Sequence, residues 1–205
     1  MSAAAIIGYI IVFLVIVAVI VAIIKQPPNL PWIFEGSQRR AGRIGEERAT
    51  NAICSVLRES DRLFTNVEIS YDDKPAELDN VIVNQYGVFV IEVKNYKGRL
   101  TGCENDYTWG KYHTSDAGNV YYKEVKNPIK QVKRQVYILA NYLRQNISSK
   151  VWVEGYALLL DNNSPVESQY VLSSIEEINK AIHSSKRNRL NQKNINEIVN
   201  LLSVE

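Results

Sequence analysis

The chain has 205 residues, of which 46% are hydrophobic, and 24 Lys and Arg against 22 Asp and Glu give a formal net charge of +2. This near-neutral balance excludes a strongly basic protein of the kind whose composition alone indicates nucleic-acid binding. Cys54 and Cys103 are the only cysteines and lack metal-ligand or redox spacing, so we expect two reduced thiols and no disulfide framework.

The first segment, Ala3 to Ile24, carries no charged side chain and is dense in Ile and Val. As a helix it would be about 33 Å long, enough for a hydrocarbon core of about 30 Å. A cleaved signal peptide fits poorly, because no Lys or Arg precedes the run and no small-x-small site follows it. Basic residues follow the span, so the positive-inside rule places the N-terminus outside and the main domain in the cytoplasm. We therefore predict a single-pass cell-membrane anchor in residues 1–25.

Three prolines within residues 26–38 predict an extended juxtamembrane linker. The chain beyond the linker is long enough for one soluble domain with a sizeable core. We place the main domain in residues 39–160. We expect residues 161–205 to add a strand and helices that pack on this domain or extend it.

The domain opens with a helix from about Gly42 to Arg58. Its apolar stripe consists of Ala49, Ala52, Ile53, Val56 and Leu57. By helical phase Glu46 projects along this stripe, where a carboxylate is costly unless it is paired or binds a metal. The alternative is that Glu46, in the first turn, is exposed and merely favourable to the helix dipole.

A strand at residues 63–69 is followed by a hairpin. The β-branched and aromatic runs 81–83 and 88–93 flank a turn at residues 84–87. If this turn has two or four residues, Val83 lies opposite Val88. A turn of odd length would break the pairing.

Counting outward from that pair places Val81 opposite Val90 and Asp79 opposite Glu92. Directly opposed residues share a face and lie about 4.5–5.5 Å apart at Cβ, and Lys94 shares the face of Glu92 two residues earlier. Two such carboxylates form a hard oxygen site suited to Mg²⁺, and a lysine beside them can orient water or neutralise charge on a phosphate. The alternative is a cross-strand salt bridge on a solvated sheet face, but the position of Asp79 favours the functional interpretation.

Residues 98–122 are rich in Tyr, Thr and Gly and predict a further short hairpin or an extended loop. Asn127-Pro128 then starts a helix, because it combines a cap residue with proline at the first position. Its predicted stripe is Val132, Val136, Leu139 and Leu143. The run 151–160 predicts a buried strand. Beyond it we expect a short strand at 170–172, a helix from Ser174 with a capping-box pattern, and a last helix at about 193–202.

Four basic residues gather at the start of the helix that follows Asn127: Lys126, Lys130, Lys133 and Arg134. A charge run of this kind is commonly a solvated helix face. Cations at a helix N-terminus oppose its dipole, however, and with the free amide groups they would suit a phosphate backbone. The sequence leaves both interpretations open. His113 and His183 stand alone, and we expect them on the surface or in loops.

The order helix, three strands, helix, strand, with Glu46, Asp79, Glu92 and Lys94 in sequence, resembles the PD-(D/E)XK nuclease superfamily. More closely, it is similar to the nuclease-related domain (NERD) family. The matching segments are Gly42–Glu46 for the Gly-x-x-Gly-Glu opening, Glu77–Val83 for the acidic strand, Gly87–Gly98 for the Glu-x-Lys strand, and Asn127-Pro128 with Gln131 for the second helix. The chain departs from the superfamily pattern in having no proline directly before Asp79.

This resemblance implies an α/β fold of the restriction-endonuclease type, with a central mixed sheet flanked by helices. It also implies metal-dependent cleavage of phosphodiester bonds, with Mg²⁺ or Mn²⁺ as the cofactor. Asp79 and Glu92 would be the metal ligands and Lys94 the catalytic lysine. Glu46 would be an auxiliary acid and Gln131 a polar helper.

We therefore predict a membrane-anchored nuclease that acts on nucleic acid, with DNA favoured over RNA. The alternative is a catalytically silent module that binds nucleic acid or protein at the membrane. A third hypothesis is an anchor that recruits partners through its C-terminal helices. The intact set of Asp79, Glu92 and Lys94 favours the enzyme, since a purely structural role would not require all three.

Overall fold

The computed structural model describes residues 37–96, 98–115, 117–159, 166–185 and 189–203, with the side chains of helix α2 (Ser37–Cys54) described from Gly42 onward. Residues 41–205 form a compact unit. The predicted span Ala3–Ile24 and the linker after it lie outside the described residues. Among the residues described, no helix combines the length and the apolarity needed to cross a membrane.

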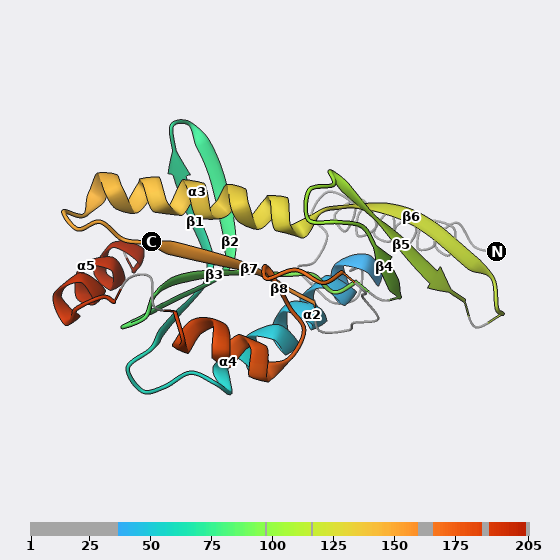
Figure 1. Cartoon of the computed structure of the whole chain (residues 1–205), viewed down its shortest axis with the longest axis horizontal. Helices are drawn as coiled ribbons and strands as arrows, with labels where there is room; N and C mark the ends of the chain where they lie inside the picture. Colours follow the sequence, from blue (N-terminus) through green and yellow to red (C-terminus); the bar gives the residue numbers. More distant parts are fainter. Residues whose placement is uncertain (1–36, 97, 116, 160–165, 186–188, 204–205) are drawn as a thin grey trace, which may run out of the picture. The chain divides into compact units, whose positions relative to one another are not determined.

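Within these residues, a mixed sheet of five strands in the order β1-β2-β3-β7-β8 forms the centre of the unit (Figure 1). The strands are β1 (Arg62–Tyr71), β2 (Lys74–Asn84), β3 (Gly87–Val93), β7 (Val153–Leu158) and β8 (Val171–Leu172). Tight turns make β1, β2 and β3 antiparallel neighbours. β7 is parallel to β3 because a long crossover joins them, and β8 is parallel to β7.

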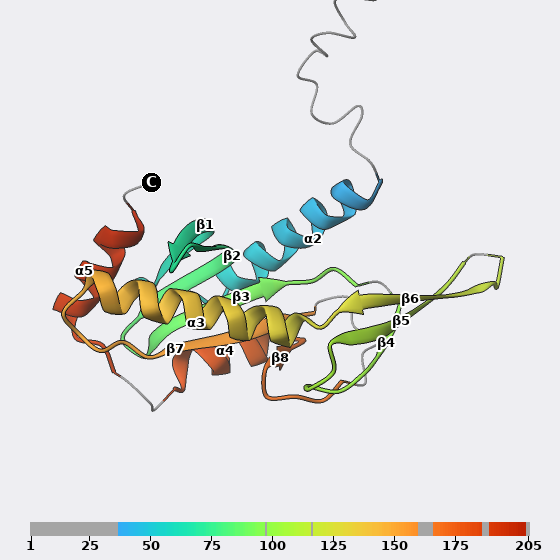
Figure 2. The same cartoon turned by 90° about the horizontal axis from the view of Figure 1, so that it is seen from above.

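Helices cover both faces of this sheet (Figures 1 and 2). On one face, α3 (Pro128–Asn146) and α5 (Gln192–Leu202) bury apolar side chains against β1, β2, β3 and β7. On the other face, α2 and α4 (Ile175–His183) pack on β2, β3, β7 and β8. The predicted mixed α/β fold, with a central sheet flanked by helices, is confirmed.

A second, three-stranded antiparallel sheet lies within the crossover from β3 to β7. It consists of β4 (Arg99–Thr101), β5 (Thr108–Thr114) and β6 (Val120–Lys126), in that order. Its own small core contains Leu100, Trp109, Ile129, Leu159 and Val166. Of the short hairpin or extended loop that the sequence predicted here, the structure forms the hairpin, as β5 and β6. β4 adds a third strand, and the sheet projects from the main unit (Figure 2).

The predicted register of the central hairpin is confirmed. Val83 pairs with Val88 and Val81 with Val90, across a turn of two residues. The helix predicted over 42–58 starts earlier and ends at Cys54. The cap at Asn127 is also confirmed, because its side chain accepts a hydrogen bond from the Ile129 amide at 2.9 Å.

The expectation that both histidines lie on the surface is correct for His113 and wrong for His183. His183 is buried at the end of α4, where its Nε2 lies 2.8 Å from Asp61 Oδ2 and its Nδ1 lies 2.6 Å from Asn179 Oδ1. Two polar partners make the burial possible. They lie 122 and 4 positions away in the sequence, so the distant one gives no local signal.

The alternation of side chains along β2 shifts at the point where the candidate site lies. Leu78 and Val81, an odd number of residues apart, pack into the same apolar cluster. In β1 the ladder pairs Thr65 with Asn80 and Val67 with Leu78, and Asn66 between them has a left-handed backbone with φ of 53°. A regular strand would alternate strictly. The β1–β2 pair is therefore irregular opposite Asp79, which the sequence analysis did not predict.

Candidate active site

Glu92, near the end of β3, is only 1% exposed. Three donors reach its carboxylate from the described residues. Lys94 Nζ and Gln131 Nε2 both bond Oε1, the latter at 2.5 Å, and Gln135 Nε2 bonds Oε2 at 2.6 Å. A carboxylate buried this deeply must be paired and hydrogen-bonded to remain charged. The two glutamines and the lysine meet this requirement.

Asp79 lies beside Glu92, but not by the simple route that strand alternation predicts. The β2–β3 ladder ends at the pair Asn80 and Ile91, one pair before Asp79 and Glu92. The Asp79 side chain instead turns toward the β3 backbone, where its Oδ2 accepts a hydrogen bond from the Val93 amide at 2.8 Å. The irregularity in β2 thus aims this carboxylate at the edge of β3.

The two carboxylates interact electrostatically. Burial first, and then the charge of Glu92, raise the pKa of Asp79 to about 6, although the Val93 amide and Lys94 oppose the shift. Burial lowers the pKa of Lys94, but the charges of Glu92 and Asp79 outweigh it, and the pKa ends above its ordinary value. Lys94 is therefore a firmly held cation beside two acidic groups that repel each other.

Glu46 borders the same site from α2. Its side chain is exposed, whereas Ala49 and Ile53 of the same helix stripe are buried. It still lies close enough to Asp79 to raise the pKa of that carboxyl. Glu46 and Asp79 line one hollow, together with residues of α2 and of the irregular part of β1 and β2.

Two glycines allow the helices to approach the site closely. A Cβ atom on Gly45 would lie 2.5 Å from Asn95 Cβ, so only glycine lets α2 pack against the residue after Lys94. A Cβ atom on Gly155 would lie 2.4 Å and 2.5 Å from side-chain atoms of Val136 and Val132. Glycine in β7 therefore lets α3 sit close to the sheet and brings Gln131 and Gln135 to Glu92.

The four residues of the predicted basic cluster have different surroundings in the structure. Lys133 Nζ bonds Glu104 Oε1 at 2.7 Å and lies 4.5 Å from the Tyr170 ring centroid. Lys130 Nζ lies 4.0 Å from the Tyr107 ring centroid. Arg134 bonds the Pro75 carbonyl at 2.9 Å, and Lys126 is exposed at the end of β6. Of the four, Arg134 lines the same hollow as Gln131 and Gln135.

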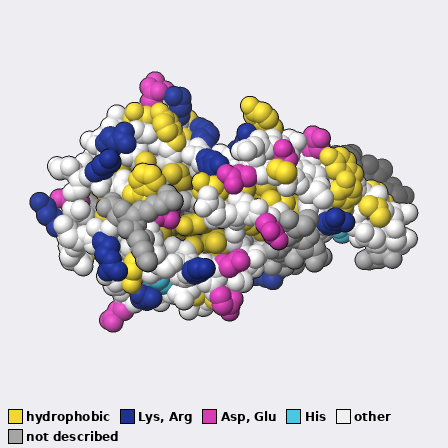
Figure 3. All heavy atoms as spheres, viewed as in Figure 1, with side chains coloured by type: hydrophobic (Ala, Val, Ile, Leu, Met, Phe, Trp, Pro, Cys, Tyr) yellow, Lys and Arg dark blue, Asp and Glu magenta, His cyan; other side chains and the backbone are white. Residues whose placement is uncertain are grey.

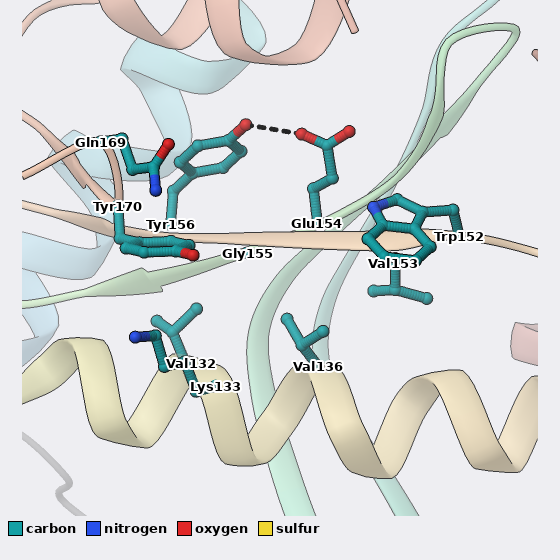
Figure 4. A pocket seen from close by; sticks show the side chains of 10 residues that line it. All are labelled: Val132, Lys133, Val136, Trp152, Val153, Glu154, Gly155, Tyr156, Gln169 and Tyr170. Carbon is teal, nitrogen blue, oxygen red and sulfur yellow. Dashed lines mark hydrogen bonds between the residues drawn. The ribbon is translucent and has the colours of Figure 1, made fainter. Parts of the chain in front are cut away.

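A separate apolar pocket of about 220 Å³ lies between α3 and β7 (Figure 4). Val132 and Val136 point into it from α3, a different face of the helix from the one that carries Gln131 and Gln135. Glu154 also lines this pocket, and its carboxylate accepts a hydrogen bond from the Tyr156 hydroxyl at 2.8 Å. The pocket does not include the acidic pair and is not the candidate active site.

The residues present fit a hydrated divalent cation. Among the described residues, no three His, Cys, Asp or Glu side chains lie close enough together to hold a metal. Mg²⁺ commonly needs only one or two protein carboxylates because it keeps several waters. Asp79 and Glu92 supply two, and the pKa of Asp79 is raised first by burial and then by the neighbouring charge of Glu92. Gln135 Oε1, buried without a hydrogen-bond partner among the described residues, is a further oxygen acceptor beside Glu92.

Sequence reasoning missed two polar residues of this site. Gln135 was not singled out, although it lies one turn after Gln131 and therefore on the same helix face. Asn80 is 2% exposed and makes long contacts to Thr50 Oγ1 at 3.4 Å and to the Ile91 carbonyl at 3.5 Å. The helical spacing of the glutamines could have identified Gln135, but no local signal marks Asn80.

Comparison with known proteins agrees with this geometry. The model of the nuclease-related domain family matches residues 41–160, more than half of the chain. The chain therefore belongs to the nuclease-related domain (NERD) family, consistent with the PD-(D/E)XK superfamily. No match was found among curated proteins.

Proposed function

We propose that this protein is a metal-dependent nuclease that hydrolyses phosphodiester bonds of nucleic acid. One observation carries the proposal. A nearly inaccessible carboxylate, Glu92, is held by Lys94 and two glutamines, directly beside a second carboxylate, Asp79, whose pKa is raised. A merely structural ion pair would need neither the second carboxylate nor the deep burial, both of which cost free energy.

Asp79 and Glu92 would hold the metal, and Mg²⁺ is the expected ion, with Mn²⁺ as a substitute. When bound, the ion supplies Lewis acidity toward a phosphate oxygen and lowers the pKa of a bound water. Lys94 would stabilise negative charge that develops on the phosphate, because its ammonium is already fixed in the site. Gln131 and Gln135 hold the two oxygens of Glu92, so this carboxylate needs little reorganisation during the reaction.

Glu46 is proposed as an auxiliary acid, because it lines the hollow that contains Asp79. Nucleic acid is the proposed substrate, with DNA favoured. Lys126 and Lys130 are the members of the basic cluster whose charge is best available to phosphate. Lys133 is already paired with Glu104, and Arg134 with a backbone carbonyl.

The direct test uses the full-length chain with linear, circular and single-stranded DNA and with RNA, in Mg²⁺, Mn²⁺ or EDTA. We expect cleavage that EDTA abolishes. Glu92→Gln should abolish both cleavage and calorimetric metal binding, whereas Lys94→Ala should keep the metal and lose about 10²–10³-fold in turnover. If the wild-type protein binds no divalent metal and cuts none of the substrates, the proposal fails.

One observation favours a second candidate, a binding module without turnover. Both oxygens of Glu92 already accept hydrogen bonds, so the site is satisfied as it stands. In that case the protein would bind these substrates without cutting them, in Mg²⁺ as in EDTA and in Glu92→Gln as in the wild type. The enzyme instead predicts cleavage that EDTA and Glu92→Gln each abolish.

A further inference from the structure

The second sheet has one face that packs into a core and one face that is open. Leu100, Trp109 and Val125 point into the small apolar cluster beneath the sheet. Register places Arg99, Tyr112 and Tyr122 in one row across β4, β5 and β6, on the opposite face. Tyr112 is 39% exposed and Tyr122 is 57% exposed. Figure 3 shows hydrophobic side chains over this part of the molecule, with basic and acidic ones scattered among them.

The two tyrosine rings are arranged as a pair. Their centroids are 5.1 Å apart, and their planes are inclined by 54°. The Tyr122 ring lies against Gly110, where a Cβ atom would be 2.9 Å from the ring's Cε2. A glycine at this position therefore lets the ring rest on the sheet. The result is a solvent-facing aromatic surface held in place by its own strands.

The open face carries a small excess of positive charge. Arg99 of β4 and Lys126 of β6 lie on it with one acidic residue, Glu124, whereas Lys111 and Lys123 lie in the row of Leu100 on the packed face. Arg99 lines a hollow on the open face together with Tyr112, Thr114 and Val120. Cations beside exposed aromatic rings on a sheet are the chemistry that binds a nucleic-acid strand.

The second sheet contacts the segment that follows the candidate active site through its packed face. Tyr96, two residues after Lys94, has its ring centroid 5.7 Å from Lys111 Nζ of β5 and its hydroxyl 3.4 Å from the Lys126 carbonyl of β6. β6 then leads through Asn127 into α3, the helix whose Gln131 bonds Glu92. Lys126, on the open face, directly precedes the Asn127 cap of this helix, so the open face ends next to the element that supplies Gln131.

We propose that the open face of the second sheet binds unpaired nucleotides of the substrate. Bases would stack on Tyr112 and Tyr122, and Arg99 and Lys126 would contact phosphates. We propose unpaired rather than paired bases because the faces of the bases are stacked on one another inside a duplex, whereas a single strand exposes them. This inference rests on the proposed nuclease function and names the substrate class of that site: nucleic acid with a single-stranded stretch.

The test measures binding rather than cleavage. Full-length protein in EDTA is titrated against fluorescein-labelled oligothymidylate, single-stranded RNA of the same length and duplex DNA, and anisotropy is recorded. Tyr122→Ala and Tyr112→Ala should each weaken single-strand binding about 5- to 100-fold, as expected for loss of one stacked base. Tyr122→Phe should restore binding, because the ring is kept. Arg99→Ala should reduce the dependence of affinity on salt concentration by about one phosphate contact.

Tyr121→Ala is the matched control. Tyr121 is the preceding residue of β6 and is also 57% exposed, but alternation places it on the other face, opposite His113. It should bind oligothymidylate as the wild type does. Trp109, which is 1% exposed beneath the sheet, contributes to the intrinsic fluorescence of the protein. An emission spectrum equal to that of the wild type verifies that each variant keeps the sheet folded.

Three results would overturn the inference: an equal loss in Tyr121→Ala, equal affinity of the wild type for duplex, or Tyr122-dependent binding to anionic lipid vesicles without oligonucleotide binding. The last would make the face a membrane contact. Failure here is separable from failure of the nuclease proposal. If Tyr122→Ala leaves metal-dependent cleavage unchanged, only the proposal that the second sheet binds unpaired nucleotides is refuted. If strand binding depends on Tyr122 but no cleavage occurs, only the nuclease proposal is refuted.

Discussion

Asp79 is the residue at which the candidate site has the clearest energetic cost. Its pKa is about 6 in the folded protein, above the ordinary value of 3.8. The folded state therefore holds the proton more tightly than the unfolded state, and stability falls as the pH rises from about 4 to about 6. Two pH units correspond to about 3 kcal/mol, which is an upper figure for this group.

Asp79→Asn removes this penalty while keeping an oxygen that can accept from Val93. In EDTA at neutral pH we expect the variant to unfold several degrees above the wild type, and near pH 4 we expect the two to unfold together. Differential scanning fluorimetry across pH is the measurement. Added Mg²⁺ should stabilise the wild type and leave the variant unchanged. A variant less stable than the wild type in EDTA at neutral pH would contradict this account.

At this scale the sequence predicted the residues that share one hairpin. Asp79, Glu92 and Lys94 are linked by strand register, and register follows from the turn. Gln135 and Asn80 were not predicted, because a buried amide has the same sequence signature as an exposed one. The role of Gln135 depends on Glu92, which is 43 positions away, and the contacts of Asn80 are to Thr50 and Ile91, 30 and 11 positions away.

At the scale of the elements, the close packing of α2 depends on Gly45, which has no side chain. We expect Gly45→Ala to push α2 away from Asn95, because the new Cβ atom would lie 2.5 Å from the Asn95 Cβ. Overpacking of this kind costs about 1–3 kcal/mol. The shift should also lower cleavage, since Glu46 moves with the helix. Chemical denaturation and a nuclease assay together test this.

Gly42→Ala is the control in the same helix. The nearest atom to its Cβ would be Glu46 Oε1 at 3.9 Å, an ordinary contact. Alanine favours a helix over glycine by about 1 kcal/mol, so this variant should be as stable as the wild type or more stable. Equal losses in both variants would show that the glycines matter for a reason other than close approach.

Element boundaries were predictable where local chemistry sets them. Asn127 caps α3, and Ser174 caps α4 by accepting from the Glu177 amide at 3.2 Å. The second sheet was predicted only as a short hairpin or a loop, because its strands alternate poorly and their pairing depends on a core formed with α3. Asn127 shows this dependence, since its Nδ2 also donates to the carbonyls of Cys103, Glu104 and Asp106.

For the whole molecule, the sequence makes a prediction about the segment before the described residues. We expect the chain to stay with membranes after carbonate washing, because Ala3–Ile24 is apolar and long enough to span a bilayer. Protease added outside intact cells should leave the main domain uncut. Release by carbonate would refute the anchor, and digestion from outside would reverse the topology.

The fold class was predictable from the order of elements, because alternating strands and helices leave few packing solutions. The shift of alternation in β2 was not, since it arises where Asn66 adopts a left-handed conformation opposite the acidic strand. Asparagine can adopt this conformation, but the presence of an asparagine in the sequence does not predict it.

The parallel pairing of β3 with β7 has a consequence for the order in which the site assembles. Asp79, Glu92 and Lys94 belong to one hairpin, but Gln131 and Gln135 arrive only when about sixty residues of crossover close onto the sheet. Closing so long a loop is entropically expensive, so it comes late in folding. We expect Gln135→Ala to accelerate unfolding in stopped-flow experiments and to leave the refolding rate almost unchanged. The acidic pair would then spend the early part of folding in water, and its burial would be among the last events. A refolding rate that falls in proportion to the lost stability would instead place α3 on the sheet at the folding barrier.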